Sequence, residues 1–409
     1  MKIGNIKLNR RLAVMFPMGF ASGLPLALSG GTLQAWLTTA GIDIKTIGLF
    51  SMVAIPYTFK FLWSPIMDGV RLPFLGRRRG WILLCQVCLS ILCMTMAFLN
   101  PSSQISALAM AALLLAFFSA SQDIVIDAYR TDVLKERERG LGVGLTVTGY
   151  RIAMLVSGAL ALILADHIGW KNTYLLMAFL MAACVTFSLV APEPEYVNQA
   201  PTTLYDAVIE PLKDLFSRRA IIGMLILIVL YKIGDAFAGT LTTAFLIRGA
   251  GFSPSDVGTI NKGLGLVATI LGAMTGGALM TRMGLFRSLM FFGILQAVSN
   301  LAFMALSIIG KSYPVMIFAV GLENICGGMG TAAFVSLLMA LCNTRFSATQ
   351  YALLSALASV GRVFVGPPSG YLVACLGWPK FFFVTFLAAI PGLLLLYFLK
   401  DQILCLDRE

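Results

Sequence analysis

Long apolar runs separated by short polar segments dominate the chain. The runs fall near residues 12–37, 47–67, 81–99, 105–130, 142–165, 171–191, 220–247, 257–281, 287–309, 313–342, 349–375 and 379–399. Each is close to the length of about 20 apolar residues that an α-helix needs to cross a bilayer. Strands of a membrane β-barrel would instead show alternating segments of about 10 residues. The pattern therefore predicts an all-α membrane protein with twelve transmembrane helices.

Composition supports lipid as the main solvent of the chain. Of its 409 residues, 58% are hydrophobic and only 12% are charged, whereas soluble domains carry about 25% charged residues. A soluble protein of this size would need many more charged side chains to cover its surface. We therefore expect a multi-pass membrane protein.

The basic residues predict an orientation. If the N-terminus lies in the cytoplasm, most of the 30 Lys and Arg residues fall in cytoplasmic segments, and the outside loops hold Lys45, Lys171, Arg248, Lys311 and Lys380. This bias is the positive-inside rule. Both termini are then cytoplasmic, and no signal-peptide cleavage site follows the first run. The net charge of +11 is scattered over short loops, so it indicates topology and not nucleic-acid binding.

Matching features recur at an offset of about 210 residues, which indicates two related halves. Gly48 has its counterpart in Gly258, and Gly149-Tyr-Arg151 in Gly361-Arg362. An offset of six helices returns the chain to the same side, so the halves are parallel, an arrangement that resembles the major facilitator fold. We predict a six-helix bundle over 1–191, a linker with an amphipathic cytoplasmic helix over 192–219, and a second bundle over 220–409.

Metal and thiol chemistry have little support. The eight Cys lie almost entirely in apolar runs, and the one His, His167, lies in an outside loop. Cys85 and Cys88 form a C-x-x-C without a second pair or a nearby His. We therefore predict no metal, no cofactor and no enzymatic activity.

Ionisable residues inside the predicted helices are the main functional signal. They are Lys60, Asp123, Asp127, Arg151, Lys232, Asp235, Lys262, Glu323 and Arg362. Each unpaired charge at the bilayer centre costs about 2.5–3.5 kcal/mol even on the lenient insertion scale. These side chains must therefore face the interior, pair with each other, or line an aqueous cavity.

Asp123 and Asp127 are the candidates for proton coupling. They lie four residues apart, hence on one face of the fourth helix. Two carboxylates that share a site in a low dielectric favour holding a proton between them, as a proton-coupled carrier requires. The alternative is permanent pairing with Arg130 or Arg151.

Basic residues outnumber acidic ones within the predicted helices, with Lys60, Arg151, Lys232, Lys262 and Arg362 against four carboxylates. The candidate ligand contacts are Gln34, Tyr57, Lys60, Gln122, Lys232, Asp235, Asn261, Lys262, Glu323 and Asn324. Lys232 and Asp235, three residues apart, can also pair on their own helix, whereas Lys262 has no acidic residue within one turn. Spare positive charge suits a substrate with carboxylates.

Three further charges are candidates for gating or charge balance. Arg151 and Arg362 occupy equivalent places in the repeat. Asp68 precedes a basic run that ends at Arg79, and it could pair across helices in one conformational state. The alternative for this loop is the positive-inside bias alone.

Several motifs resemble AmpG-type muropeptide permeases. They include Gly19-Phe-Ala-Ser-Gly-Leu-Pro25, Lys60-Phe-Leu-Trp-Ser-Pro65, Ser121-Gln-Asp-Ile-Val-Ile-Asp127, Lys232-Ile-Gly-Asp235 and Phe346-Ser-Ala-Thr-Gln350. The resemblance covers essentially the whole chain. It implies a major facilitator fold in the inner membrane of Gram-negative bacteria, a role in cell-wall recycling and an influence on β-lactamase induction. The family's acidic pair corresponds to Asp123 and Asp127.

The resulting hypothesis is proton-coupled import, by alternating access around a cavity between the halves. The implied substrate is N-acetylglucosaminyl-1,6-anhydro-N-acetylmuramic acid with its peptide derivatives. We expect a monomer in the lipid bilayer whose partners are this muropeptide and protons. Two alternatives remain: an exporter of amphiphilic compounds with the same fold, and a membrane receptor that binds muropeptide without moving it.

Overall fold

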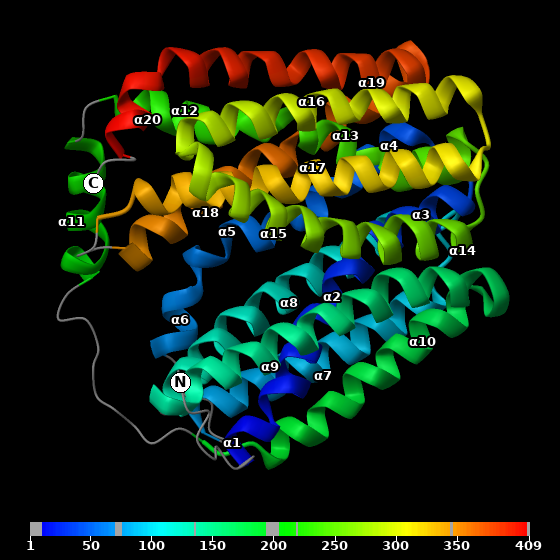
Figure 1. Cartoon of the computed structure of the whole chain (residues 1–409). Coiled ribbons are helices and arrows are strands. Elements are labelled where there is room, and N and C mark those ends of the chain that lie inside the picture. The colour runs from blue at the N-terminus through cyan, green and yellow to red at the C-terminus, as the bar shows by residue number, and fades with distance from the viewer. Residues whose placement is uncertain are drawn as a thin grey trace. The chain divides into compact units, whose positions relative to one another are not determined.

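The structure is a computed structural model that describes residues 10–69, 76–134, 136–193, 204–217, 220–343 and 347–406. Helices joined by short connections make up these ranges, and no strand occurs in them. Figure 1 shows the helices as long rods that follow the apolar runs. The chain divides into two compact units, which are described separately below.

The first unit comprises residues 1–42, 53–198 and 253–259. Its helices are α1 (Arg10–Ala13), α2 (Met15–Ser29), α3 (Gly31–Thr39), α5 (Ile55–Phe59), the 3₁₀-helix η2 (Lys60–Leu62), α6 (Ser64–Gly69), α7 (Arg77–Phe98), α8 (Ile105–Val133), α9 (Glu136–Met154), the π-helix η3 (Leu155–Leu160), α10 (Ala161–Val190) and α14 (Pro254–Asp256). Within it α2 packs on α9, and α7 packs on α8 and α10.

The second unit comprises residues 43–52, 199–252 and 260–409. Its helices are α4 (Ile44–Leu49), α11 (Leu204–Ser217), α12 (Ile221–Tyr231), α13 (Ile233–Ala244), the π-helix η4 (Phe245–Gly249), α15 (Gly265–Met283), α16 (Leu285–Ile309), α17 (Tyr313–Ala340), α18 (Ser347–Phe364), α19 (Gly366–Phe398) and α20 (Lys400–Leu406). Within it α17 packs between α15 and α16, and α19 packs on α16. Helix α11 lies in the predicted linker.

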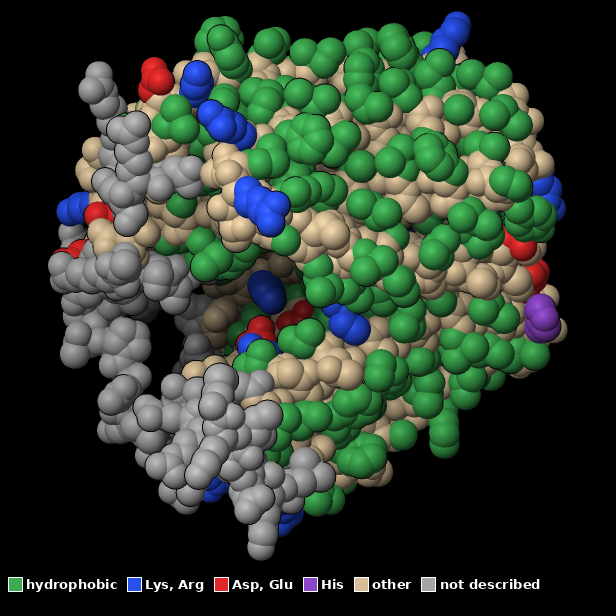
Figure 2. All heavy atoms as spheres, in the orientation of Figure 1, with side chains coloured by type: hydrophobic (Ala, Val, Ile, Leu, Met, Phe, Trp, Pro, Cys, Tyr) green, Lys and Arg blue, Asp and Glu red, His purple; other side chains and the backbone are tan. Residues whose placement is uncertain are grey.

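Nine helical segments of the described chain are long and apolar enough to cross a membrane. Two of them, Leu141–Val190 and Leu353–Phe398, are long enough for two crossings each. Both turn at a glycine with positive φ, Gly169 (φ 80°) and Gly377 (φ 73°). A further run over 44–69 is broken into short helices, so the architecture agrees with twelve crossings. Hydrophobic side chains cover most of the face seen in Figure 2.

Each unit contains a short segment from the opposite half of the sequence. Helix α4 belongs to the second unit, where Gly48 packs so closely on α19 that a Cβ would lie 2.6 Å from the Gly366 carbonyl oxygen. Reciprocally, α14 belongs to the first unit, where the Ser255 amide donates to Asp166 (3.4 Å). The two segments are repeat equivalents. Sequence analysis did not anticipate this exchange, and its division at 191 and 220 stays a prediction.

Several glycines that lie four residues apart, such as Gly19 and Gly23 or Gly272 and Gly276, are sites of close helix contact. In the first unit, a Cβ on Gly19 would lie 2.0 Å from the Thr146 carbonyl oxygen of α9. In the second, a Cβ on Gly272 would lie 2.2 Å from the Ile325 carbonyl oxygen of α17. Only glycine permits such an approach of two backbones. Gly144 differs, since a Cβ there meets nothing within 4 Å.

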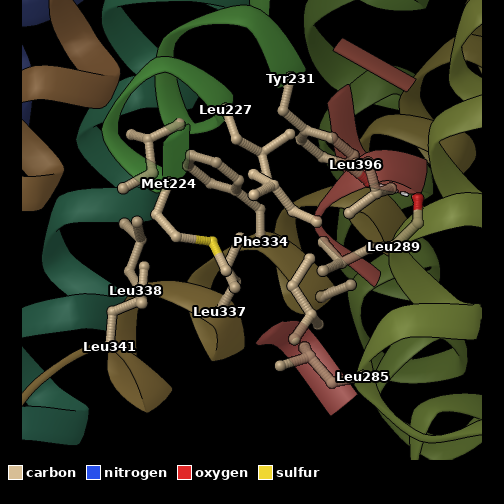
Figure 3. Packing of buried hydrophobic residues seen from close by; sticks show 14 of the residues in the cluster. Met224, Leu227, Tyr231, Leu285, Leu289, Phe334, Leu337, Leu338, Leu341 and Leu396 are labelled. Atoms are coloured by element: carbon tan, nitrogen blue, oxygen red, sulfur yellow. Dashed lines mark hydrogen bonds between the residues drawn. The ribbon is translucent and has the colours of Figure 1, made fainter. Parts of the chain in front are cut away.

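Buried side chains of α12, α16, α17 and α19 form the core of the second unit (Figure 3). The rings of Tyr231 and Phe334 stack with their centroids 5.6 Å apart. The Tyr231 hydroxyl donates to the Leu289 carbonyl oxygen (2.9 Å), the dashed line in Figure 3. This core fixes the helix segment that immediately precedes Lys232.

Candidate transport site

Asp123 lies on α8 of the first unit and is held by α2. Ser22 donates its hydroxyl to Asp123 Oδ1 at 2.5 Å, which is short even for a hydrogen bond to a carboxylate. Lys60 and Asp127 are its charged electrostatic neighbours. No cation among the described residues lies within 4.0 Å of Asp123 in an ion pair. Among the described contacts, the Asp123 carboxyl group is held by a hydroxyl and not by an ion pair, and its role in proton coupling stays a prediction.

Asp127 has a different environment on the same helix. Its Oδ1 lies 3.1 Å from Arg130 Nη2, and its side chain is 60% exposed. The pairing with Arg130 that the sequence left open therefore occurs for Asp127. An exposed ion pair of this kind contributes little to stability.

The remaining candidates of the first unit are Tyr57, Lys60, Gln34 and Gln122. Tyr57 lies 3.5 Å from the Ser29 hydroxyl, and Lys60 begins the short helix η2; both are half-buried near Asp123. Gln34 is half-buried on α3. Gln122 is fully buried, and neither of its amide atoms has a hydrogen-bond partner among the described residues.

Lys232 sits where α12 ends and α13 begins. Its Nζ lies 3.7 Å from Asp235 Oδ2 and donates to the Thr331 hydroxyl (3.3 Å) of α17. It also lies 5.9 Å from the centre of the Phe334 ring. The intrahelical pair expected for Lys232 and Asp235 is confirmed, and α17 adds two further contacts.

Two further charged residues of the second unit, Lys262 and Glu323, come from different helices. Lys262 lies on the π-helix η5 (Val257–Leu264) with Asn261 and donates to the Thr243 hydroxyl (3.3 Å). Glu323 on α17 is its acidic electrostatic neighbour. Because Lys262 has no acidic residue within one turn of its own helix, its acidic neighbour comes from another helix. The Asn324 amide donates to Glu323 Oε2 (2.9 Å).

The charges of the second unit leave a surplus of positive charge. Lys232 interacts electrostatically with Asp235, Arg362 and Glu323, and Glu323 also with Lys262. Three cations therefore face two carboxylates in one connected cluster. Such a cluster favours a ligand that bears a negative charge.

Of the three gating candidates, Arg362 belongs to this cluster through its electrostatic interaction with Lys232. Arg151 and Arg362 are exposed, on α9 and α18. Asp68 belongs to α6, and its side chain lies outside the described residues. Their gating role stays a prediction.

Sequence analysis missed a cluster at the start of α7. Arg78 is buried and its Nε lies 2.9 Å from Asp132 Oδ2 of α8. Glu193, just beyond α10, accepts from the backbone amides of Arg78 (3.0 Å) and Arg79 (3.3 Å). A carboxylate at a helix N-terminus is favourable because it satisfies free amides. The signal was available in the basic run at 77–79 and in an acidic residue placed between two prolines.

Comparisons with known proteins identify the class. The Major Facilitator Superfamily matches residues 15–345. A peptide transporter of POT type in complex with sulfate has a TM-score of 0.74 at 13% identity, covering 99% of this chain and 97% of its own. A D-xylose–proton symporter has a TM-score of 0.71 at 12% identity, covering 95% and 97%. The chain is therefore a multi-pass membrane protein that belongs to the major facilitator superfamily.

Sequence relatives narrow the family. The chain is 56% identical over 387 residues to the anhydromuropeptide permease of Escherichia coli K12, covering 94% of this chain and 79% of the relative. It is 34% identical over 413 residues to the transporter AmpG 4 of Rickettsia conorii, covering 98% and 100%. The expected resemblance is thus confirmed over 94% and 98% of the chain, respectively.

Proposed function

We propose that this protein carries anhydromuropeptides across the bacterial inner membrane from periplasm to cytoplasm, driven by protons. The observation that carries the proposal is the 56% identity to a relative named anhydromuropeptide permease. The ligand is N-acetylglucosaminyl-1,6-anhydro-N-acetylmuramic acid, alone or with its peptide. Both termini are then cytoplasmic, the protein acts as a monomer, and the proton gradient takes the place of a cofactor.

The charges of the two units support a division of tasks. In the first unit, Asp123 is a half-buried carboxyl group held by a hydroxyl, which suits proton binding. In the second, Lys232 and Lys262 supply positive charge beside hydroxyl groups. The lactyl and peptide carboxylates of the ligand complement that charge. Arg151, Arg362 and Asp68 remain candidates for gating.

The test is uptake of radiolabelled anhydro-disaccharide into right-side-out membrane vesicles with an imposed inward proton gradient. We expect the vesicles to concentrate the ligand, and a protonophore to reduce the internal concentration to the external one. Accumulation that survives collapse of the gradient contradicts the proton coupling. Saturable binding without accumulation indicates the receptor alternative, and net efflux from loaded vesicles along the same gradient indicates an exporter.

A further inference from the structure

Helix α17 presents one partly exposed face in the second unit. Glu323, Gly327 and Thr331 lie four residues apart on it, so their side chains follow one another along that face. Glu323 and Gly327 are half-buried and Thr331 is exposed, whereas the neighbouring Gly328 is buried against α15. The face thus has a carboxylate one turn before a glycine and a hydroxyl one turn after it.

Packing beside Gly327 is sparse among the described residues. A Cβ at this position would meet a single described atom outside the backbone of α17, Nε2 of Gln296, at 3.5 Å. The neighbouring Gly330 is different: a Cβ there would lie 2.7 Å from Gln296 Oε1 and 3.9 Å from Lys232 Nζ. The two glycines therefore admit the Gln296 amide from α16, and only Gly327 leaves room beyond it.

The amide nitrogen nearest to Gly327 lacks a hydrogen-bond partner among the described residues. Gln296 is 4% exposed, and its Nε2 makes no hydrogen bond with any described residue. A buried amide nitrogen without a partner is unfavourable, because its lost hydration is not replaced by a hydrogen bond. Native proteins therefore usually satisfy such groups with water or a ligand. Its carbonyl end already faces Gly330, near the Lys232 ammonium.

The geometry points to a subsite for a secondary amide group beside Gly327, with Gln296 as the donor to its carbonyl oxygen. The amide N–H of the ligand then faces the Glu323 carboxylate one helical turn away, and the small substituent of the amide fills the space beside the glycine. This inference rests on the proposed function, because both an acetamido group of the sugars and a peptide bond of the ligand have this chemistry.

The test variant is Gly327→Ala, which fills the space without a clash. Its methyl group meets Gln296 at an ordinary contact distance, so the fold is expected to persist. Loss of one neutral hydrogen bond weakens binding about three- to tenfold. The matched control is Gly321→Ala on the same helix, where a Cβ meets nothing within 4 Å. We expect the control to bind like the unmodified protein.

The measurement is equilibrium binding to the purified full chain by calorimetry, with three probes: the anhydro-disaccharide, its de-N-acetylated form, and the disaccharide with its peptide. If an acetamido group occupies the subsite, the de-N-acetylated probe binds weakly and the effect of Gly327→Ala disappears with it. If a peptide bond does, the effect appears only with the peptide-bearing probe. Unchanged affinity of Gly327→Ala for all three probes overturns the inference.

A second variant, Gln296→Leu, removes the donor and leaves no unsatisfied amide. We expect the same loss of affinity, and a double variant no weaker than the weaker single one, because both changes remove one contact. Additive losses contradict the shared subsite. Since binding does not require transport, failure of vesicle uptake would refute the proposed function without deciding this test.

Discussion

The ion pair of Lys232 and Asp235 allows its structural and transport roles to be separated. The two charges lie 3.7 Å apart, with side chains 12% and 28% exposed. At an effective dielectric constant near 20, their attraction is about 4 kcal/mol. Lys232→Gln leaves the carboxylate in the membrane interior without its cation, and removal of one partner of such a pair typically costs about 3–5 kcal/mol.

We expect Lys232→Gln to destabilise the protein by about 3 kcal/mol, because the pair is not fully buried. A chain of 409 residues then loses roughly 4 °C in melting temperature. Lys232→Gln/Asp235→Asn should regain most of that loss, since no uncompensated charge remains. The assay is thermal unfolding in detergent, with Lys171→Gln at an exposed site as the charge-matched control.

Uptake of the double variant decides the role of the lysine. If Lys232 binds the anionic ligand, the stable double variant still fails to concentrate anhydro-disaccharide in vesicles. Transport at the unmodified rate by a stable double variant would show that the pair only cancels its own charge. A Lys232→Gln protein with the same melting temperature as the unmodified protein would refute the energetic reasoning.

Three further predictions concern other parts of the chain. Asp123→Asn should abolish gradient-driven accumulation while sparing ligand exchange, and Asp127→Asn should retain both, because Asp127 already pairs with Arg130; accumulation by Asp123→Asn vesicles would contradict this assignment. Phe334→Ala should lower the free energy of unfolding in detergent by about 2–3 kcal/mol, less than in a soluble core because lipid removes the transfer term. Phe318 is 62% exposed on the same helix, so Phe318→Ala should lower it far less. Ser253→Ala should lower the free energy of unfolding by about 1 kcal/mol, because it removes the capping box with Asp256. The Ser253→Thr variant keeps the hydroxyl and should have a melting temperature close to that of the unmodified protein.

The sequence predicted the membrane class and the fold because hydrophobicity alone determines which segments can lie in lipid. Twelve runs and a repeat of about 210 residues were enough for a parallel two-bundle fold. Intramembrane charges such as Lys262 and Glu323 were also visible, since their cost in lipid demands a partner. The sequence could not assign those partners, because a charge reaches across helices whose rotation and register depend on packing.

Tertiary structure decided which groups meet. Asp123 and Asp127 share a helix face in the sequence, yet one is held by Ser22 and the other pairs with Arg130. Helix α4 lies beside α19 because the backbones approach closely at Gly48. The sparse packing at Gly327, next to the unpaired Gln296 amide, likewise depends on how α16 and α17 meet. Residue identity determines what a side chain can do, and only the packing of distant helices determines which neighbour is within the few ångströms at which it acts.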